Sequence, residues 1–408
     1  MLPADALDRL AASGAEPGGA VAVVRDGVVE VDHCVGTRDG VGAWSSDTLV
    51  MTYSVAKPFA ALAVLDAVRA GSLGLDEPVA SVWPEFGVAG KGATTVRHLL
   101  CHQAGLPAFP EAAAEVGYDD REALVALLAA APPVHPPGAA VAEHALTYGH
   151  LLDEVLRRAT GEALDERFAR IAGEAGWDLH LRVGPTDLGR VATVVESQEG
   201  WRSAYLADPR WSPALSRPPG LLDPDVLNSE RFRRTPFPAV SLHASALALA
   251  TFYDDVRRPG GLVGQRLGAD LWRAYTEPAA TGHDLVIDRP VTWTPGFQVD
   301  VEDGRAEIGM GGAGGCSAWA EPAAGYGAAY VTRGLGGFDR GEAVWEAVRA
   351  EFRPRGVGQP RFKEGAVVAS LCPGTSEARK PIVMRERIRR VHGACGRSMH
   401  SVLVPSYS

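Results

Sequence analysis

The stretch MTYSVAKPFAALAVL, from Met51 to Leu65, places a serine and a lysine three residues apart at the start of an apolar segment. Apolar residues recur at helical spacing from Pro58 onward, so Ser54 and Lys57 are expected on the first turn of a helix. Because residues three apart share one helix face, the Lys57 amine can reach the Ser54 hydroxyl, and the free N–H groups of the turn favour an anion there. The pattern therefore predicts a nucleophile beside its base.

An isolated S-x-x-K pattern also has a purely structural interpretation. Ser54 can cap the helix, and Lys57 can be a surface cation whose stem covers apolar side chains. The rest of the chain has to decide between the two.

The composition is that of a soluble globular protein. Of 408 residues, 46% are hydrophobic and 22% charged, and no apolar run approaches the length of a membrane span. The net charge of −10 argues against nucleic acid or an anionic membrane as the main partner. The N-terminus lacks a basic region followed by an apolar one, so we expect a cytoplasmic enzyme.

The five cysteines are odd in number and widely scattered, without C-x-x-C pairing. The sequence therefore indicates neither a disulfide framework nor a zinc site, and it predicts no metal and no cofactor.

Predicted strands stand at both ends of a helical middle. Residues 18–36 predict a hairpin with its turn at 25–27, and from Thr292 alternating runs predict an antiparallel meander, with turns at 303–304 and 322–325. Helices are expected at 242–256 and 341–352.

These elements predict an α/β (α+β) fold, in which an antiparallel sheet is flanked by helices and carries a large helical insertion. We assign residues 1–60 and 231–353 to the sheet domain and 61–230 to a mainly helical domain. Residues 354–408 form a basic C-terminal tail, for which a partner contact, a loosely ordered appendage and an altered reading frame at the end of the gene are alternative interpretations.

Five blocks together carry a family resemblance. They are SVAK (54–57), GSLGLDEPVASVWPEF (71–86), TVRHLLCHQAGLP (95–107), PGAAVAEHALTYGHLLDEVLRRATG (137–161) and GMGGAGGCSAWAEP (309–322). In this order and spacing they resemble the serine β-lactamase-like superfamily over roughly residues 15–353, nearest to class C-like carboxylesterases and penicillin-binding-protein homologues. The resemblance implies an antiparallel sheet and a helical domain with the active site between them.

The resemblance also implies a mechanism. Ser54 would attack an acyl carbonyl, Lys57 would accept its proton, and the acyl-enzyme would pass to water or another nucleophile. The backbone N–H groups of Ser54 and Ala313 would form the oxyanion hole. Glycines around 311–315 suit a strand that must approach the acyl group closely.

The sequence departs from the family at the position of the catalytic tyrosine. Five residues after Gly138, where the family usually has Tyr, this chain has Glu143. Tyr148 lies five residues further on, where the family often packs an aromatic ring. Either residue is a candidate proton shuttle, and we favour Tyr148 narrowly because a phenol beside a lysine stays closer to the family chemistry.

A second departure concerns the substrate. Met310 stands where the family has the Lys or His of K-T-G or H-x-G, and a thioether offers neither a proton nor a charge. Penicillin hydrolysis is therefore disfavoured, and an uncharged acyl donor is expected in an apolar site. The lining residues that we predict are Tyr53, His150, Met310, Gly311, Gly312 and Trp319.

The remaining histidines have mainly structural interpretations. His98 and His102 have the spacing of a metal pair but no third ligand, so packing and capping roles are favoured. His150 and His243 are weaker candidates for supplementing the base.

Three functions are compatible with these residues. The first is a carboxylesterase acting on a small-molecule ester through an acyl-enzyme. The second is an acyltransferase that passes the acyl group to an amine or alcohol acceptor. The third is a non-catalytic binding homologue, which is disfavoured because a binding pocket needs no nucleophile beside a base.

Overall fold

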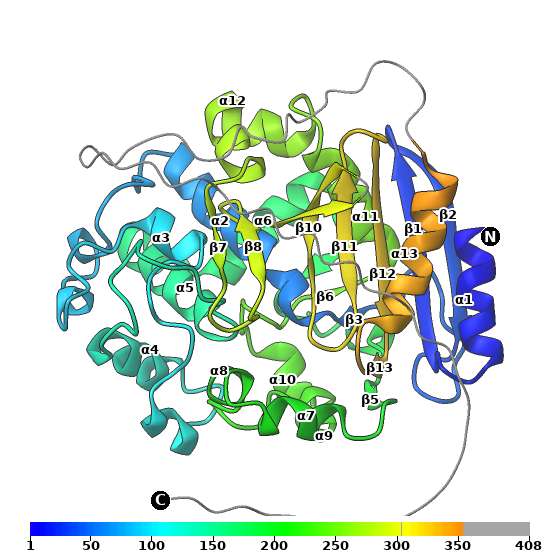
Figure 1. Cartoon of the computed structure of the whole chain (residues 1–408), viewed down its shortest axis with the longest axis horizontal. Helices are drawn as coiled ribbons and strands as arrows, with labels where there is room; N and C mark the ends of the chain where they lie inside the picture. Colours follow the sequence, from blue (N-terminus) through cyan, green and yellow to red (C-terminus); the bar gives the residue numbers. More distant parts are fainter. Residues whose placement is uncertain (303, 354–408) are drawn as a thin grey trace, which may run out of the picture. The chain divides into compact units, whose positions relative to one another are not determined.

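An eight-stranded antiparallel sheet forms the centre of the protein in the computed structural model, which describes residues 1–302 and 304–353. The strand order is β2-β1-β12-β11-β10-β9-β8-β7, so the N-terminal hairpin pairs with the last strand of the C-terminal meander (Figure 1). The strands are β1 (Gly18–Arg25), β2 (Val28–Gly36), β7 (Ala280–His283), β8 (Pro290–Trp293), β9 (Gln298–Glu302), β10 (Arg305–Gly311), β11 (Ser317–Glu321) and β12 (Tyr326–Thr332).

The β1–β2 hairpin forms where the sequence predicts it. Its valine-rich strands favour extended backbone, and the turn residues Asp26 and Gly27 both have left-handed φ angles, +53° and +79°. Such a turn matches the right-handed twist of the two strands, and β1 then lies buried between β2 and β12.

The two faces of the sheet are covered by different helices. On one face α1 (Pro3–Ala12) and α13 (Asp339–Glu351) pack over a cluster that includes Val21, Tyr330 and Trp345. On the other face α11 (Ala246–Val256) crosses β1, β11 and β12. Because side chains alternate along a strand, β1 and β12 contribute both to this cluster and to the larger core on the α11 face. The predicted helices near 242–256 and 341–352 are thus confirmed.

The helical part is built around α2 (Lys57–Arg69), in which every residue from Lys57 to Ala67 is buried. A helix that is apolar on all sides belongs inside, and α2 packs against α5, α6 and α12. The other helices are α3 (Val96–Leu100), α4 (Arg121–Ala130), α5 (Thr147–Thr160), α6 (Leu164–Ala175), α7 (Trp201–Ala207), α8 (Trp211–Leu215), α9 (Pro224–Leu227), α10 (Glu230–Arg234) and α12 (Leu262–Thr276).

Two small sheets join the helical part to the rest. The strands β3 (Val50–Met51), β6 (His243–Ala244) and β4 (Leu179–His180) form one of them, so the segment that leads into Ser54 is held by residues far along the chain. In the other, β5 (Val195–Glu196) pairs with β13 (Gly334–Leu335).

The antiparallel sheet and its flanking helices confirm the predicted fold class. The β7–β8 hairpin precedes the predicted start of the meander at Thr292 and was missed. The domain boundaries after residues 60 and 230 stay predictions, and the predicted tail, 354–408, lies outside the described residues. Within the described part of the chain, no helix is long and apolar enough to cross a bilayer.

Candidate active site

The nucleophile candidate Ser54 lies in a 3₁₀ turn, Tyr53–Ala56, that runs directly into α2. Tyr53 has a left-handed φ of +51°, which is rare and costly for a residue with a side chain. This bend carries the chain from β3 into the helix, and Ser54 is left 9% exposed. The turn is tighter than the α-helical first turn that the sequence predicts, yet it keeps Ser54 and Lys57 on one face.

Lys57 is in hydrogen-bond contact with Ser54. Its Nζ lies 2.6 Å from Ser54 Oγ, and the residue is 1% exposed. Burial lowers the pKa of the Lys57 ammonium, and the neighbouring Glu143 carboxylate opposes part of that shift. The alternative of a surface lysine beside a capping serine is therefore wrong: Lys57 is enclosed and placed to take a proton from Ser54.

Glu143 extends this pair into a chain of three groups. Its Oε1 lies 3.1 Å from Lys57 Nζ, and the residue is 5% exposed. Burial raises the pKa of the Glu143 carboxyl, Lys57 lowers it, and the nearby Asp284 carboxylate raises it further. Since burial moves the two pKa values toward each other, it favours a neutral amine beside a protonated carboxyl over a buried ion pair.

Among the described residues, the Tyr148 hydroxyl has no hydrogen bond to Ser54, Lys57 or Glu143. The Tyr148 hydroxyl donates to the Leu100 carbonyl at 3.3 Å, and its ring stacks on His102 with centroids 4.8 Å apart. Burial raises the pKa of the phenol well above its usual value. Contact with Lys57 thus favours Glu143 over the narrowly preferred Tyr148, whose ring the helix turn aims into the core, and which of the two carries the proton stays a prediction.

The glycine-rich turn after β10 meets the nucleophile turn at backbone distance. A Cβ atom on Gly312 would lie 2.1 Å from the Thr52 carbonyl oxygen, so only glycine fits there. The Gly312 N–H donates to the Cys316 carbonyl, and the Gly312 carbonyl accepts from the Gly315 N–H, both at 2.8 Å. Ala313 is thereby held beside the Ser54 turn, as an oxyanion donor would have to be.

Helix α7 supports this turn with aromatic side chains that the sequence analysis missed. Trp201 Nε1 donates to the Ala313 carbonyl at 3.0 Å, and the Tyr205 hydroxyl donates to the same oxygen at 3.4 Å. Trp201 also packs edge-on against Tyr53, and Tyr205 against Trp211. The spacing of Trp201 and Tyr205, one helical turn apart in a Gly- and Pro-rich segment, was the available signal.

Several predicted lining residues have other roles. The Tyr53 ring is 2% exposed and its hydroxyl donates to the Leu221 carbonyl, so it supports the site from within. Met310 is 3% exposed and packs with Val141 and Trp293, which confirms its apolar setting. The prediction that Trp319 lines the site is wrong. Trp319 packs on the face of the sheet covered by α1 and α13, whereas Ala318 faces the side covered by α11. Gly311 also faces α13, toward Phe338.

Within the described residues, His98, His102 and His243 bond to backbone groups and not to the side chains of Ser54, Lys57 or Glu143. His98 caps α3 by accepting from the Thr95 N–H, and His102 accepts from the His144 N–H, which confirms the capping and packing interpretation. His243 is buried, with Nδ1 2.8 Å from the Ser241 carbonyl. No group of three or more His, Cys, Asp or Glu side chains within residues 1–302 and 304–353 could hold a metal ion.

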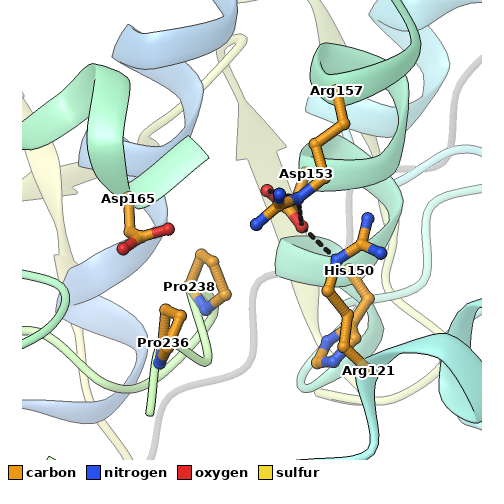
Figure 2. Close-up of a pocket in the computed structure, with 7 residues that line it drawn as sticks. All are labelled: Arg121, His150, Asp153, Arg157, Asp165, Pro236 and Pro238. Atoms are coloured by element: carbon orange, nitrogen blue, oxygen red, sulfur yellow. Dashed lines mark hydrogen bonds and ion pairs between the residues drawn. The ribbon is translucent and has the colours of Figure 1, made fainter. Parts of the chain in front are cut away.

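His150 lies in a separate small pocket (Figure 2) and not at Ser54. Its ring packs edge-on against Phe109 and Phe237, and burial lowers the pKa of the imidazole to about 4. The sequence-based prediction of His150 as a substrate contact is therefore corrected. The other residues of the pocket are Arg121, Asp153, Arg157, Asp165, Pro236 and Pro238.

Comparison with known proteins finds relatives by sequence and by structure. The esterase/beta-lactamase LipL of Mycobacterium tuberculosis (strain ATCC 25618 / H37Rv) is 30% identical over 348 residues, which cover 77% of this chain and 76% of LipL. A penicillin-binding protein homologue from Caulobacter crescentus superposes with a TM-score of 0.72 at 31% identity, over 85% of this chain and 96% of that one. A family VIII carboxylesterase superposes with a TM-score of 0.74 at 29% identity, over the same shares of the two chains.

The family model described as Beta-lactamase matches residues 4–351, almost the whole described part of the chain. This protein therefore belongs to the Beta-lactamase family, as the order and spacing of its motifs predicted, and is a serine hydrolase or acyltransferase.

Proposed function

We propose that this protein hydrolyses uncharged carboxylic esters through an acyl-enzyme on Ser54. The observation that carries the proposal is the buried chain of contacts from Ser54 Oγ to Lys57 Nζ, 2.6 Å, and from Lys57 Nζ to Glu143 Oε1, 3.1 Å. A serine side chain in contact with an enclosed amine, whose pKa burial lowers, has the arrangement of an activated nucleophile.

In the first half of the reaction, Ser54 Oγ forms a bond to the carbonyl carbon of the ester while its proton passes to the free amine of Lys57. The carbonyl oxygen becomes an oxyanion, held by the N–H groups of Ser54 and Ala313. When the tetrahedral intermediate collapses, the bond to the alkoxy oxygen breaks and the proton leaves with the alcohol. The leaving alkoxide takes its proton from the Glu143 carboxyl, which is reprotonated by the Lys57 ammonium, so both groups return to their starting state.

In the second half, water replaces the alcohol. Water gives its proton to Lys57 as its oxygen attacks the acyl carbon, and the Ser54–acyl bond breaks to release the acid and regenerate the hydroxyl. An acceptor alcohol or amine can follow the same route in place of water, which would make the protein an acyltransferase.

The proposed substrate is uncharged because position 310, near the end of β10, is a methionine. Met310 is packed among apolar side chains, where the family has the Lys or His that binds a substrate carboxylate. The aromatic side chains of α7, together with Met310, favour an apolar acyl or alkoxy group. The names of LipL and of the family VIII carboxylesterase, an esterase and a carboxylesterase, agree with this choice.

The test combines a probe and a substrate panel. A fluorophosphonate should label the protein on Ser54, and p-nitrophenyl esters of increasing acyl length should be hydrolysed, while benzylpenicillin should not be turned over at a comparable rate. Added amine or alcohol acceptors would divert the product if acyl transfer competes with hydrolysis. Labelling without turnover of any ester would favour a binding homologue, and an adduct on another residue would overturn the assignment.

Glu143 and Tyr148 give opposite expectations for the proton shuttle. Glu143→Gln keeps the shape but cannot release a proton, so kcat should fall by about 10²-fold. Tyr148→Phe should change kcat by less than about threefold, because its hydroxyl only donates to the Leu100 carbonyl, while the melting temperature falls slightly for the lost hydrogen bond. Steady-state kinetics with one good ester compare the two, and a large kcat loss in Tyr148→Phe would restore the tyrosine mechanism.

A further inference from the structure

Asp284 is a fully buried carboxylate directly behind Glu143. It follows β7 in the loop to β8, and its Oδ1 accepts from three backbone N–H groups: that of Glu143 at 3.1 Å, Val286 at 2.9 Å and Ile287 at 3.0 Å. The Leu285 N–H donates to the Val141 carbonyl beside it. The loop after β7 therefore fixes the backbone of the residue whose side chain contacts Lys57.

The other carboxylate oxygen of Asp284, Oδ2, does not help to anchor the loop. Within the described residues, Oδ2 is buried and has no hydrogen-bond partner. Burying a carboxylate with an unsatisfied oxygen is costly, and the amide oxygen of an asparagine would accept the same three N–H groups without a charge. Anchoring the loop thus explains Oδ1 but does not explain why this residue is acidic.

We infer that Asp284 is a positioning residue for the Ser54–Lys57–Glu143 chain, whose Oδ1 fixes the backbone of Glu143 and whose negative charge keeps a proton on the Glu143 carboxyl. With that proton on Glu143, Lys57 is left as the free amine that Ser54 requires. The inference rests on the proposed function, because it specifies how the base of that reaction is kept neutral.

The groups around Glu143 come from three elements. Lys57 of α2 and Arg289 of the loop after β7 lower the pKa of Glu143, whereas burial and Asp284 raise it. Tyr205 of α7 is close enough for the Glu143 carboxylate to contribute, after burial, to raising the pKa of the phenol to about 12, so Tyr205 is neutral near pH 7.

The histidines near Lys57 add no charge at neutral pH. Burial lowers the pKa of His144 to about 3 and that of His102 well below its usual value. The charge balance at Glu143 is thus set mainly by Lys57, Arg289 and Asp284.

The sign of the effect follows from this balance. As pH falls, the Lys57–Glu143 pair takes up a further proton, Lys57 becomes an ammonium and Ser54 loses its base, so reactivity is lost on the acid side. Asp284→Asn removes a negative charge that favours this uptake, so the acid limb should move to lower pH by roughly one unit. The same change lets the Lys57–Glu143 pair ionise, with the proton on Lys57. The plateau of the labelling rate above the acid limb should therefore fall by roughly tenfold.

The experiment measures the rate of fluorophosphonate labelling of the full chain against pH, which reports on Ser54 without a known substrate. Asp288→Asn, in the same loop but with its side chain 53% exposed, is the matched control and should give the wild-type profile. In a Glu143→Gln background, Asp284→Asn should no longer lower the plateau of the labelling rate, because position 143 then has no proton to give to Lys57, whereas the acid limb should still move because it reports the protonation of Lys57 itself.

Folding of each variant is checked by circular dichroism and thermal melting. If Asp284→Asn does not fold, Asp284→Ser is the second variant, with an acceptor in place of the carboxylate and the same expected limb shift. A folded Asp284→Asn or Asp284→Ser with a lower plateau but the wild-type acid limb would make Asp284 purely structural and overturn the inference. In that case labelling of wild-type Ser54 still supports the proposed function, whereas no labelling of wild-type at any pH would overturn both.

Discussion

Ser54→Ala should reduce ester hydrolysis by at least about 10⁴-fold and abolish labelling by a fluorophosphonate, because no other group can form the acyl-enzyme. The fold should survive, since Ser54 Oγ contacts Lys57 and caps no helix. Intact-mass spectrometry after labelling, and peptide mapping of the wild-type adduct, provide the measurement.

The control for Ser54→Ala is Ser81→Ala, which removes another serine hydroxyl, one that donates to Glu77 and to the Pro78 carbonyl at an exposed position. This variant should label at the wild-type rate. Residual turnover in Ser54→Ala above the level of a mock-purified sample would contradict the assignment of the nucleophile.

Lys57→Arg should be nearly as damaging as Lys57→Met, with both lowering kcat/KM by about 10³–10⁴-fold. Guanidinium keeps the positive charge but cannot give up its proton near neutral pH, so it cannot accept one from Ser54. Met fills a similar volume without any charge. The pair of variants therefore separates the base function of Lys57 from its electrostatic contribution. The measurement is kcat/KM of both variants and the wild-type protein with one p-nitrophenyl ester.

Because Lys57 is 1% exposed, the larger guanidinium also strains the site, so melting temperatures have to accompany the kinetics. A folded Lys57→Arg protein with activity within tenfold of wild-type would show that position 57 supplies only a cation, and the proposed mechanism would fail at its base.

The local sequence pattern was enough to predict the elements that carry Ser54 and Lys57. The spacing of Ser54 and Lys57 fixes their contact within a single turn, and the β1–β2 hairpin depends only on alternating apolar residues and an Asp-Gly turn. In the same way, the apolar run after Pro58 predicts a buried helix wherever it lies in the fold.

The choice between Glu143 and Tyr148 depends on contacts that no local pattern contains. The Glu143 backbone is fixed by Asp284, 141 residues away in the chain, and this contact aims its carboxylate at Lys57. Tyr148 is aimed by the first turn of α5 toward Leu100 instead. A single sequence gives the residue types of such loops but not which loops meet.

The error at Trp319 has a different origin. Alternation along β11 predicts that Trp319 and Ala318 face opposite ways, but which of them shares a face with Met310 depends on the strand register. In the structure Gly309 is opposite Trp319 and Met310 opposite Ala318, which turns Trp319 toward α13. The Gly-rich turn between β10 and β11 sets this register. The sequence alone did not show how many of its residues pair with each other and how many form the loop.

The close approach of Gly312 to Thr52 has a consequence for redesigning this enzyme. Since a Cβ at Gly312 would overlap the Thr52 carbonyl, the spacing between the nucleophile turn and the Ala313 turn is set by main-chain contact and not by a replaceable side chain. Libraries that vary Met310 or Trp211, which do not hydrogen-bond to the Ala313 turn, can therefore change the side chains around the site while the spacing of the two proposed oxyanion donors stays constant. In the proposed mechanism, acyl selectivity therefore depends on replaceable side chains, whereas the oxyanion geometry depends on main-chain atoms.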